Sequence, residues 1–63
     1  MYSYEKKALH CEVMANTLQT ASKIAQKLAN YQRQSYFPTE KWERDRKKLQ
    51  EIIASLVEDS KNL

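Results

Sequence analysis

The sequence of 63 residues contains no glycine and a single proline, Pro38. Glycine and proline interrupt helices more strongly than any other residue, so only one position in this chain opposes the continuation of a helix. Pro38 also disfavours helical backbone at the residue before it. These scarcities predict one helix on each side of a turn near Pro38.

Cysteine, histidine and long apolar runs are equally scarce. Cys11 is the only cysteine, which excludes a disulfide within the chain, and together with the only histidine, His10, it supplies too few ligands for zinc. No run approaches the roughly 18 apolar residues that span a bilayer, and the first residues lack the apolar stretch of a secretory signal. We therefore expect a single cytoplasmic domain over residues 1–63, without a metal, a cofactor or a membrane span.

Before the proline, apolar residues recur three and four positions apart and predict a helix over residues 4–33. The predicted stripe consists of Tyr4, Ala8, Cys11, Met14, Ala15, Leu18, Ala21, Ala25, Leu28 and Tyr31. Its side chains are mostly small, so another helix can approach closely, and we predict that it faces the second helix. Leu9, Val13 and Ile24 fall to either side of this stripe.

After a turn at residues 34–38, a second pattern predicts a helix over residues 39–61, with Thr39 as a side-chain cap. Its apolar positions are Trp42, Leu49, Ile52, Leu56 and Leu63, widened by Ile53 and Val57. Asp45 and Arg46 interrupt the stripe near the turn. The predicted fold is therefore all-α, a two-helix antiparallel hairpin.

A hairpin of this size buries too little surface to be very stable alone, so we expect a partner protein or a second copy to complete it. The residues predicted to pack within the hairpin are Cys11, Met14, Leu18, Leu28, Trp42, Leu49, Ile52 and Leu56. The residues predicted to meet a partner protein are Tyr4, Leu9, Val13 and Ile24. Pairing with a second copy would produce a four-helix bundle.

Positive charge gathers near the turn, because residues 30–48 contain six Lys or Arg and three Asp or Glu, a balance of plus three. Aromatic residues lie in the same segment, and this combination suits single-stranded nucleic acid. The candidate phosphate contacts are Lys23, Lys27, Arg33, Arg44 and Lys48. Conversely, Glu40 to Arg44 and Glu43 to Lys47 are favourably ordered pairs four residues apart, which is typical of an ordinary solvated helix face.

Catalysis is not expected. His10 and Cys11 are adjacent, and neighbours along a helix point in different directions, so the imidazole cannot act as the base for the thiol. No third residue type completes an active site. We therefore predict a binding module with no catalytic residues.

The segment Phe37-Pro38-Thr39-Glu40-Lys41-Trp42, followed by the apolar positions of residues 49–57, resembles the small co-chaperones of type III secretion needle subunits. In that family a helical hairpin pairs with a tetratricopeptide-like chaperone and keeps the needle subunit soluble. The resemblance implies that Leu9 and Val13 meet a chaperone while residues 49–57 pack internally. The alternative is a homodimeric four-helix bundle that binds RNA or DNA through its basic tip.

Overall fold

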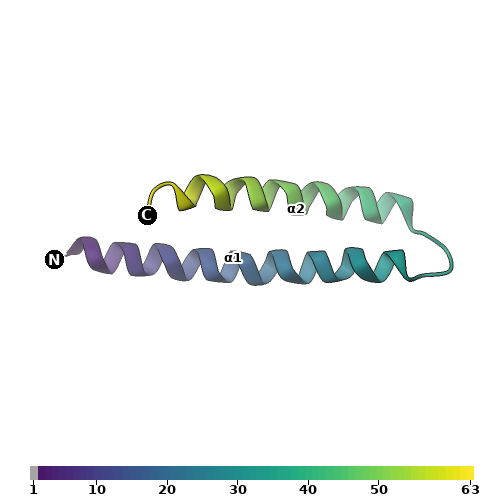
Figure 1. The fold of residues 1–63 in the computed structure, drawn as a ribbon, viewed down its shortest axis with the longest axis horizontal. Helices are drawn as coiled ribbons and strands as arrows, with labels where there is room; N and C mark the ends of the chain where they lie inside the picture. The colour runs from purple at the N-terminus through teal and green to yellow at the C-terminus, as the bar shows by residue number, and fades with distance from the viewer. Residues whose placement is uncertain (1) are drawn as a thin grey trace.

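The structure, a computed structural model, describes residues 2–63, with side chains from Tyr4 onward. Helix α1 (Tyr2–Gln32) and helix α2 (Thr39–Ser60) run side by side in opposite directions (Figure 1). The molecule is a rod with extents of 55 × 15 × 11 Å. This arrangement confirms the predicted all-α hairpin, and both helices begin and end within two residues of the predicted bounds.

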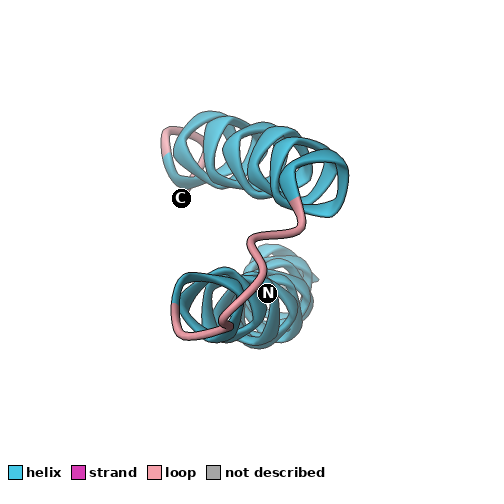
Figure 2. Ribbon diagram, turned by 90° about the vertical axis from the view of Figure 1, so that its right-hand side faces the viewer, coloured by secondary structure: helices cyan, strands magenta, loops and turns pink. Residues whose placement is uncertain are grey.

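The turn between the helices is short and partly hydrogen-bonded. The amide of Arg33 donates to the carbonyl of Asn30 at 3.1 Å, and that of Gln34 donates to Tyr31 at 3.2 Å. Pro38 is the residue before α2, and its carbonyl accepts from the amide of Trp42 at 2.9 Å. Figure 2 shows the loop crossing from one helix to the other.

Thr39 does not cap α2 with its side chain, contrary to the sequence prediction. It is the first residue of the helix, and no side-chain hydrogen bond caps this end. Proline has a fixed φ and no N–H to donate to a preceding turn. Pro38 therefore separates the two helices without a capping hydroxyl.

The packed side of the hairpin follows a strict heptad spacing on both helices. Its positions, alternately four and three residues apart, are His10, Met14, Thr17, Ala21, Ile24, Leu28 and Tyr31 in α1, and Pro38, Trp42, Asp45, Leu49, Ile52, Leu56 and Asp59 around α2. Apart from Ala29 and Arg46, no other described side chain is shielded from solvent to this degree. The spacing is that of an antiparallel coiled coil.

This packed side agrees with the sequence prediction for Met14, Leu28 and four positions of α2, namely Trp42, Leu49, Ile52 and Leu56. It corrects three other assignments. Cys11 and Leu18 do not pack inside the hairpin: both are exposed, Leu18 to 55%. Ile24 is not on a free surface but is only 8% exposed.

The error arises because α1 carries two parallel heptad stripes, which the sequence prediction merged. Met14, Ala21, Leu28 and Tyr31 belong to the packed stripe. The other members of the predicted set, Tyr4, Ala8, Cys11, Ala15, Leu18 and Ala25, form a second stripe that α2 does not cover. Residues one apart lie about 100° apart around a helix, so both stripes satisfy the same spacing rule.

Helix α1 also extends beyond α2 at the open end of the hairpin (Figure 1). His10 is level with the end of α2, because its Nε2 lies 3.1 Å from the carbonyl oxygen of Asp59. The turns of α1 that precede His10 therefore have no neighbouring helix, and Tyr4 is 79% exposed.

Candidate interaction surfaces

The hairpin presents two broad sides, and their residues differ in chemistry. Because the helices run in opposite directions, residues that directly follow a packed position lie on the same side of the hairpin in both helices. Residues that directly precede a packed position lie on the other side. The exposed residues can therefore be assigned to one side or the other from their heptad position.

One side is lined by small and apolar residues, and we call it the small-residue face. It consists of Tyr4, Ala8, Cys11, Ala15, Leu18, Ser22, Ala25 and Ala29 of α1, and Ile53 and Val57 of α2. Leu18, Ile53 and Val57 are 55%, 48% and 52% exposed. The α1 residues repeat at four and three positions without a break, which is the spacing that a further helix would match.

The small-residue face is nearly free of unbalanced charge. Within the described residues, the ionised side chains on this side of the hairpin are Glu43 and Arg46, and they neutralise one another through a bond of 2.7 Å between Oε2 and Nη2. An apolar surface with internally balanced charges can be covered without leaving an unpaired ion.

The opposite side carries cations at the turn half of the hairpin, and we call this the basic face. Its members are Lys23 and Lys27 of α1, and Lys41, Arg44 and Lys48 of α2, all of them exposed. Among the described side chains, only Arg44 has a carboxylate partner, the Oδ1 of Asp45 at 3.8 Å from its Nε. The lysine charges of this face are thus left to solvent and to any anionic ligand.

The two ion pairs that the sequence suggested within α2 do not form, although their four side chains are exposed, as on a solvated helix face. Neither Glu40 with Arg44 nor Glu43 with Lys47 forms an ion pair among the side chains that the structure describes. Glu43 bonds Arg46, three residues on, instead. Glu43 consequently lies on the side of the small-residue face, away from the basic face.

The four residues predicted to meet a partner do not share one surface. Tyr4 lies on the small-residue face, whereas Leu9 and Val13, 53% and 60% exposed, lie on the other side near the open end. Ile24 lies between the helices. Any single partner helix can therefore contact only part of the predicted set.

The predicted phosphate contacts come together more closely. Lys23, Lys27, Arg44 and Lys48 share the basic face, and Arg33 lies in the turn after α1. Lys41 also lies on this face, although it was not among the residues predicted to contact phosphates. Its signal was its position seven residues before Lys48, which puts both on the same stripe of α2.

A polar pair inside the packed side was also missed. The Tyr31 hydroxyl donates a hydrogen bond of 2.8 Å to the Oδ2 of Asp45, and Asp45 is only 6% exposed. The available signal was the heptad phase of α2, because Asp45 stands midway between Trp42 and Leu49. An aspartate at a packed position requires a partner of this kind.

This hydrogen bond makes the hairpin sensitive to alkaline pH. Donation to Asp45, then burial and the negative charge of Asp45, raise the pKa of Tyr31 above its ordinary value of 10.0, against a smaller opposing effect of Arg44. The stabilisation is complete below the unfolded pKa and is lost as pH rises through the folded pKa. We expect the melting temperature to fall above about pH 10, and to fall less in Tyr31→Phe, as measured by circular dichroism. An equal fall in both proteins would contradict this.

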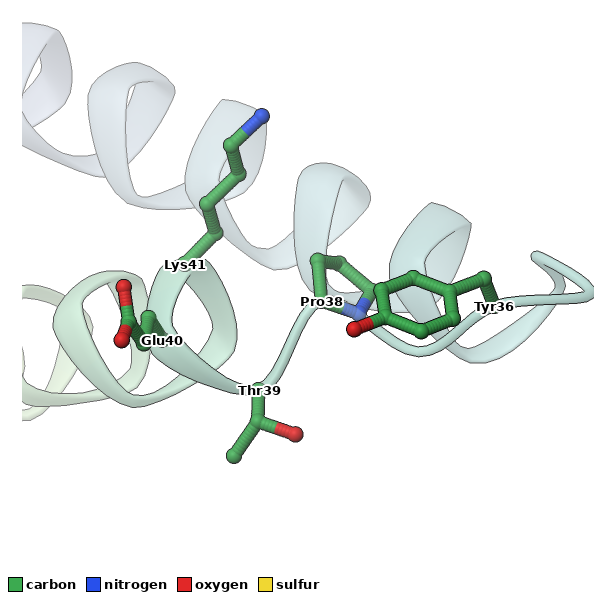
Figure 3. A pocket seen from close by; sticks show the side chains of 5 residues that line it. All are labelled: Tyr36, Pro38, Thr39, Glu40 and Lys41. Atoms are coloured by element: carbon green, nitrogen blue, oxygen red, sulfur yellow. The ribbon is translucent and has the colours of Figure 1, made fainter.

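The remaining features do not assemble a reactive site. His10 faces α2 and contacts Asp59, whereas Cys11 is exposed on the small-residue face. A shallow hollow of about 460 Å³ lies at the turn, lined by Tyr36, Pro38, Thr39, Glu40 and Lys41 (Figure 3). Within the described residues, no three His, Cys, Asp or Glu side chains converge on one point.

Comparison with protein-family models, curated proteins and solved structures finds no match for this chain. Within the part of the chain that the structure describes, neither helix is both long enough and apolar enough to cross a membrane. What the structure itself shows is a helical hairpin with one apolar and one basic side.

Proposed function

We propose that this chain is a non-catalytic protein-binding module that pairs its small-residue face with the helices of a second protein chain. The observation that supports this most directly is the second heptad stripe of α1, which α2 leaves exposed from Tyr4 to Ala25 and half-buried at Ala29. A helix with two apolar heptad stripes is suited to pack against two neighbours. Small side chains on the outer stripe allow close approach of the second neighbour.

The surface area of the hairpin is consistent with a missing neighbour. Its accessible surface is 5299 Å², whereas a compact monomer of 7.5 kDa is expected to expose about 4,200 Å². The surplus of about 1,000 Å² is comparable to the roughly 800 Å² that each partner buries in a standard interface. One further pairing would bring the exposed area to the level of a globular protein.

The occupant that we propose is a second copy of the chain. If two α1 helices pair antiparallel about a twofold axis, the stripe is self-complementary, as an isologous interface requires. Leu18 then faces Ala15 of the other copy and Tyr4 faces Ala29, so that each large side chain meets a small one. Cys11 faces Ser22 in the same register. The product is a four-helix bundle.

Charge favours the same arrangement. The chain carries a net charge of +3, and the basic face would repel its own copy. Among the described side chains, the ionised ones on the side of the small-residue face are Glu43 and Arg46, which pair with each other, so two copies can meet there without opposing like charges. A different protein with an apolar helix could use the same face, whereas the resemblance to needle co-chaperones implies a contact through Leu9 and Val13 on the other side.

The experiment is light scattering over a concentration series, with engineered variants. Leu18→Glu should convert the dimer to a monomer, because it places a charge where the partner packs, whereas Val13→Glu, on the other side and similarly exposed, should leave the dimer intact. Ser22→Cys should yield a covalent dimer on mild oxidation through Cys11 of the other copy. A parent that is monomeric at every concentration would exclude the second copy and support a heteromeric adaptor instead.

A further inference from the structure

We infer that the basic face binds the phosphodiester backbone of single-stranded nucleic acid. This inference does not depend on the proposed function, because the basic face lies on the opposite side of the hairpin from the small-residue face. Its cations come from both helices, Lys23 and Lys27 from α1 and three others from α2. The fold therefore concentrates charge that is dispersed along the sequence.

The lysines of this face carry charge that the protein itself does not neutralise. Among the described side chains, Lys23, Lys27, Lys41 and Lys48 form no ion pair. Two nearby carboxylates are occupied, Glu43 by Arg46 and Asp45 by Tyr31 and Arg44, whereas Glu51, three residues after Lys48, borders this face without forming an ion pair with its lysines. Phosphates can pair with these lysines and release counterions, which is the main source of affinity in non-specific nucleic-acid binding.

The spacing of the cations suits a strand that crosses the hairpin. Lys23 and Lys27 are one helical turn apart, about 6 Å along α1, and Lys41 and Lys48 are about 10 Å apart along α2. A stacked strand presents a phosphate about every 3.4 Å. Each helix therefore offers contacts for two or three phosphates, and the two helices lie side by side (Figure 2).

The turn adds an aromatic side chain next to this face. Tyr36 is 83% exposed and lines the same hollow as Lys41, together with Glu40. In Figure 3, Lys41 rises from the start of α2 on the opposite side of the chain from Thr39. An exposed ring beside a phosphate-binding lysine can stack an unpaired base, which favours a single strand over a duplex.

The same lysines do not favour a lipid surface. A helix that lies in a bilayer interface combines its cations with large apolar side chains that insert among the acyl chains. Among the described residues, the large apolar side chains exposed beside the cationic half of this face are Tyr36 and Phe37 in the turn, not a stripe along the helices that could insert into a bilayer. The exposed Leu9 and Val13 of this face lie toward the other end of the hairpin.

The test is fluorescence anisotropy with a labelled single-stranded RNA of about 16 nucleotides, titrated with salt from about 50 mM upward. Five contacts predict that log K falls with log salt with a slope of about −3.5. Lys23→Gln with Lys27→Gln should reduce the slope by about 1.4 and weaken binding at low salt at least tenfold. The matched control, Lys47→Gln with Lys61→Gln, removes the same charge from elsewhere on α2 and its C-terminal end and should change affinity less than threefold.

Tyr36→Ala should weaken binding about tenfold, as expected for one stacked base, whereas Tyr36→Phe should retain it. Circular dichroism of each variant verifies that the helices persist. The inference is overturned if the parent does not bind the RNA at low salt, or if the two lysine double variants lose affinity equally. It is also overturned if the parent binds phosphatidylserine vesicles but not RNA, which would assign the face to an anionic membrane.

Discussion

Ile24→Ala is expected to lower the free energy of unfolding by about 2–4 kcal/mol, because it removes three carbon atoms from the packed side and leaves a cavity that two helices fill poorly. Ile24 is 8% exposed and is flanked along its stripe by Ala21 and Leu28, which are equally buried. A single core of this size rarely supplies more than about 3–5 kcal/mol. Most of the helical signal should therefore be lost near room temperature.

The matched control is Val13→Ala. Val13 is also a β-branched residue within α1, but it is 60% exposed, so its truncation should change stability by no more than about 0.5 kcal/mol. Urea titrations followed by circular dichroism, at one fixed protein concentration, measure both changes. Equal destabilisation by the two variants would place Ile24 and Val13 in comparable environments, and would contradict the packed side described above.

Asp45→Leu is expected to raise the free energy of unfolding by about 1–3 kcal/mol, because it replaces a buried carboxylate by an apolar side chain at a packed heptad position. Asp45 is 6% exposed and lies between Trp42 and Leu49 on α2. Tyr31 is only half-buried, so water can accept its hydrogen bond in the variant. A substitution that removes a native hydrogen bond should thus stabilise the fold.

Asp45→Asn separates the charge from the hydrogen bond, since the amide oxygen still accepts from Tyr31. It should be less stable than Asp45→Leu, and its melting temperature should vary less with alkaline pH than that of the parent. Thermal unfolding by circular dichroism gives the order. If Asp45→Leu melts below the parent, the hydrogen bond to Tyr31 contributes more than leucine burial does, and the expectation fails.

The Tyr31 and Asp45 pair also suggests why a polar residue is retained inside so small a core. A hydrogen bond of 2.8 Å between one defined position of α1 and one of α2 is satisfied in a single register. If one helix shifted along the other by a heptad, leucines could still pack against leucines, but the Tyr31–Asp45 hydrogen bond would be lost. Polar residues at packed positions fix the register of coiled coils in the same way. We expect Asp45→Leu to be more stable but less uniform in register.

The two proposed surfaces are compatible in one assembly. Pairing through the small-residue faces would direct the two basic faces outward, on opposite sides of a four-helix bundle. A nucleic-acid strand long enough to reach both would gain from the higher effective concentration of the second site. Because the surfaces use different residues, Leu18→Glu and the Lys23 with Lys27 variants should affect dimerisation and binding separately.

The hairpin itself was predictable from the sequence for identifiable reasons. The absence of glycine and the position of Pro38 restrict the chain to one break, and the break falls where the structure has its turn. The α2 stripe was predictable too, since Leu49, Ile52 and Leu56 are large apolar residues with no competing set of comparable size. Burial is roughly proportional to apolar area, so α2 has one clearly preferred side.

The sequence by itself thus determined the number, the limits and the antiparallel order of the helices, and the excess of apolar surface on α1. Only the tertiary structure decided which of the two α1 stripes packs against α2. A pattern of apolar residues favours the outer stripe, with its alanines, over the inner one, which includes His10, Thr17 and Tyr31. Packing favours the inner stripe, because Ile24 and Leu28 bury more apolar area than alanine does. Its polar side chains also find hydrogen-bond partners: His10 bonds the carbonyl of Asp59, Thr17 that of Val13, and Tyr31 the carboxylate of Asp45.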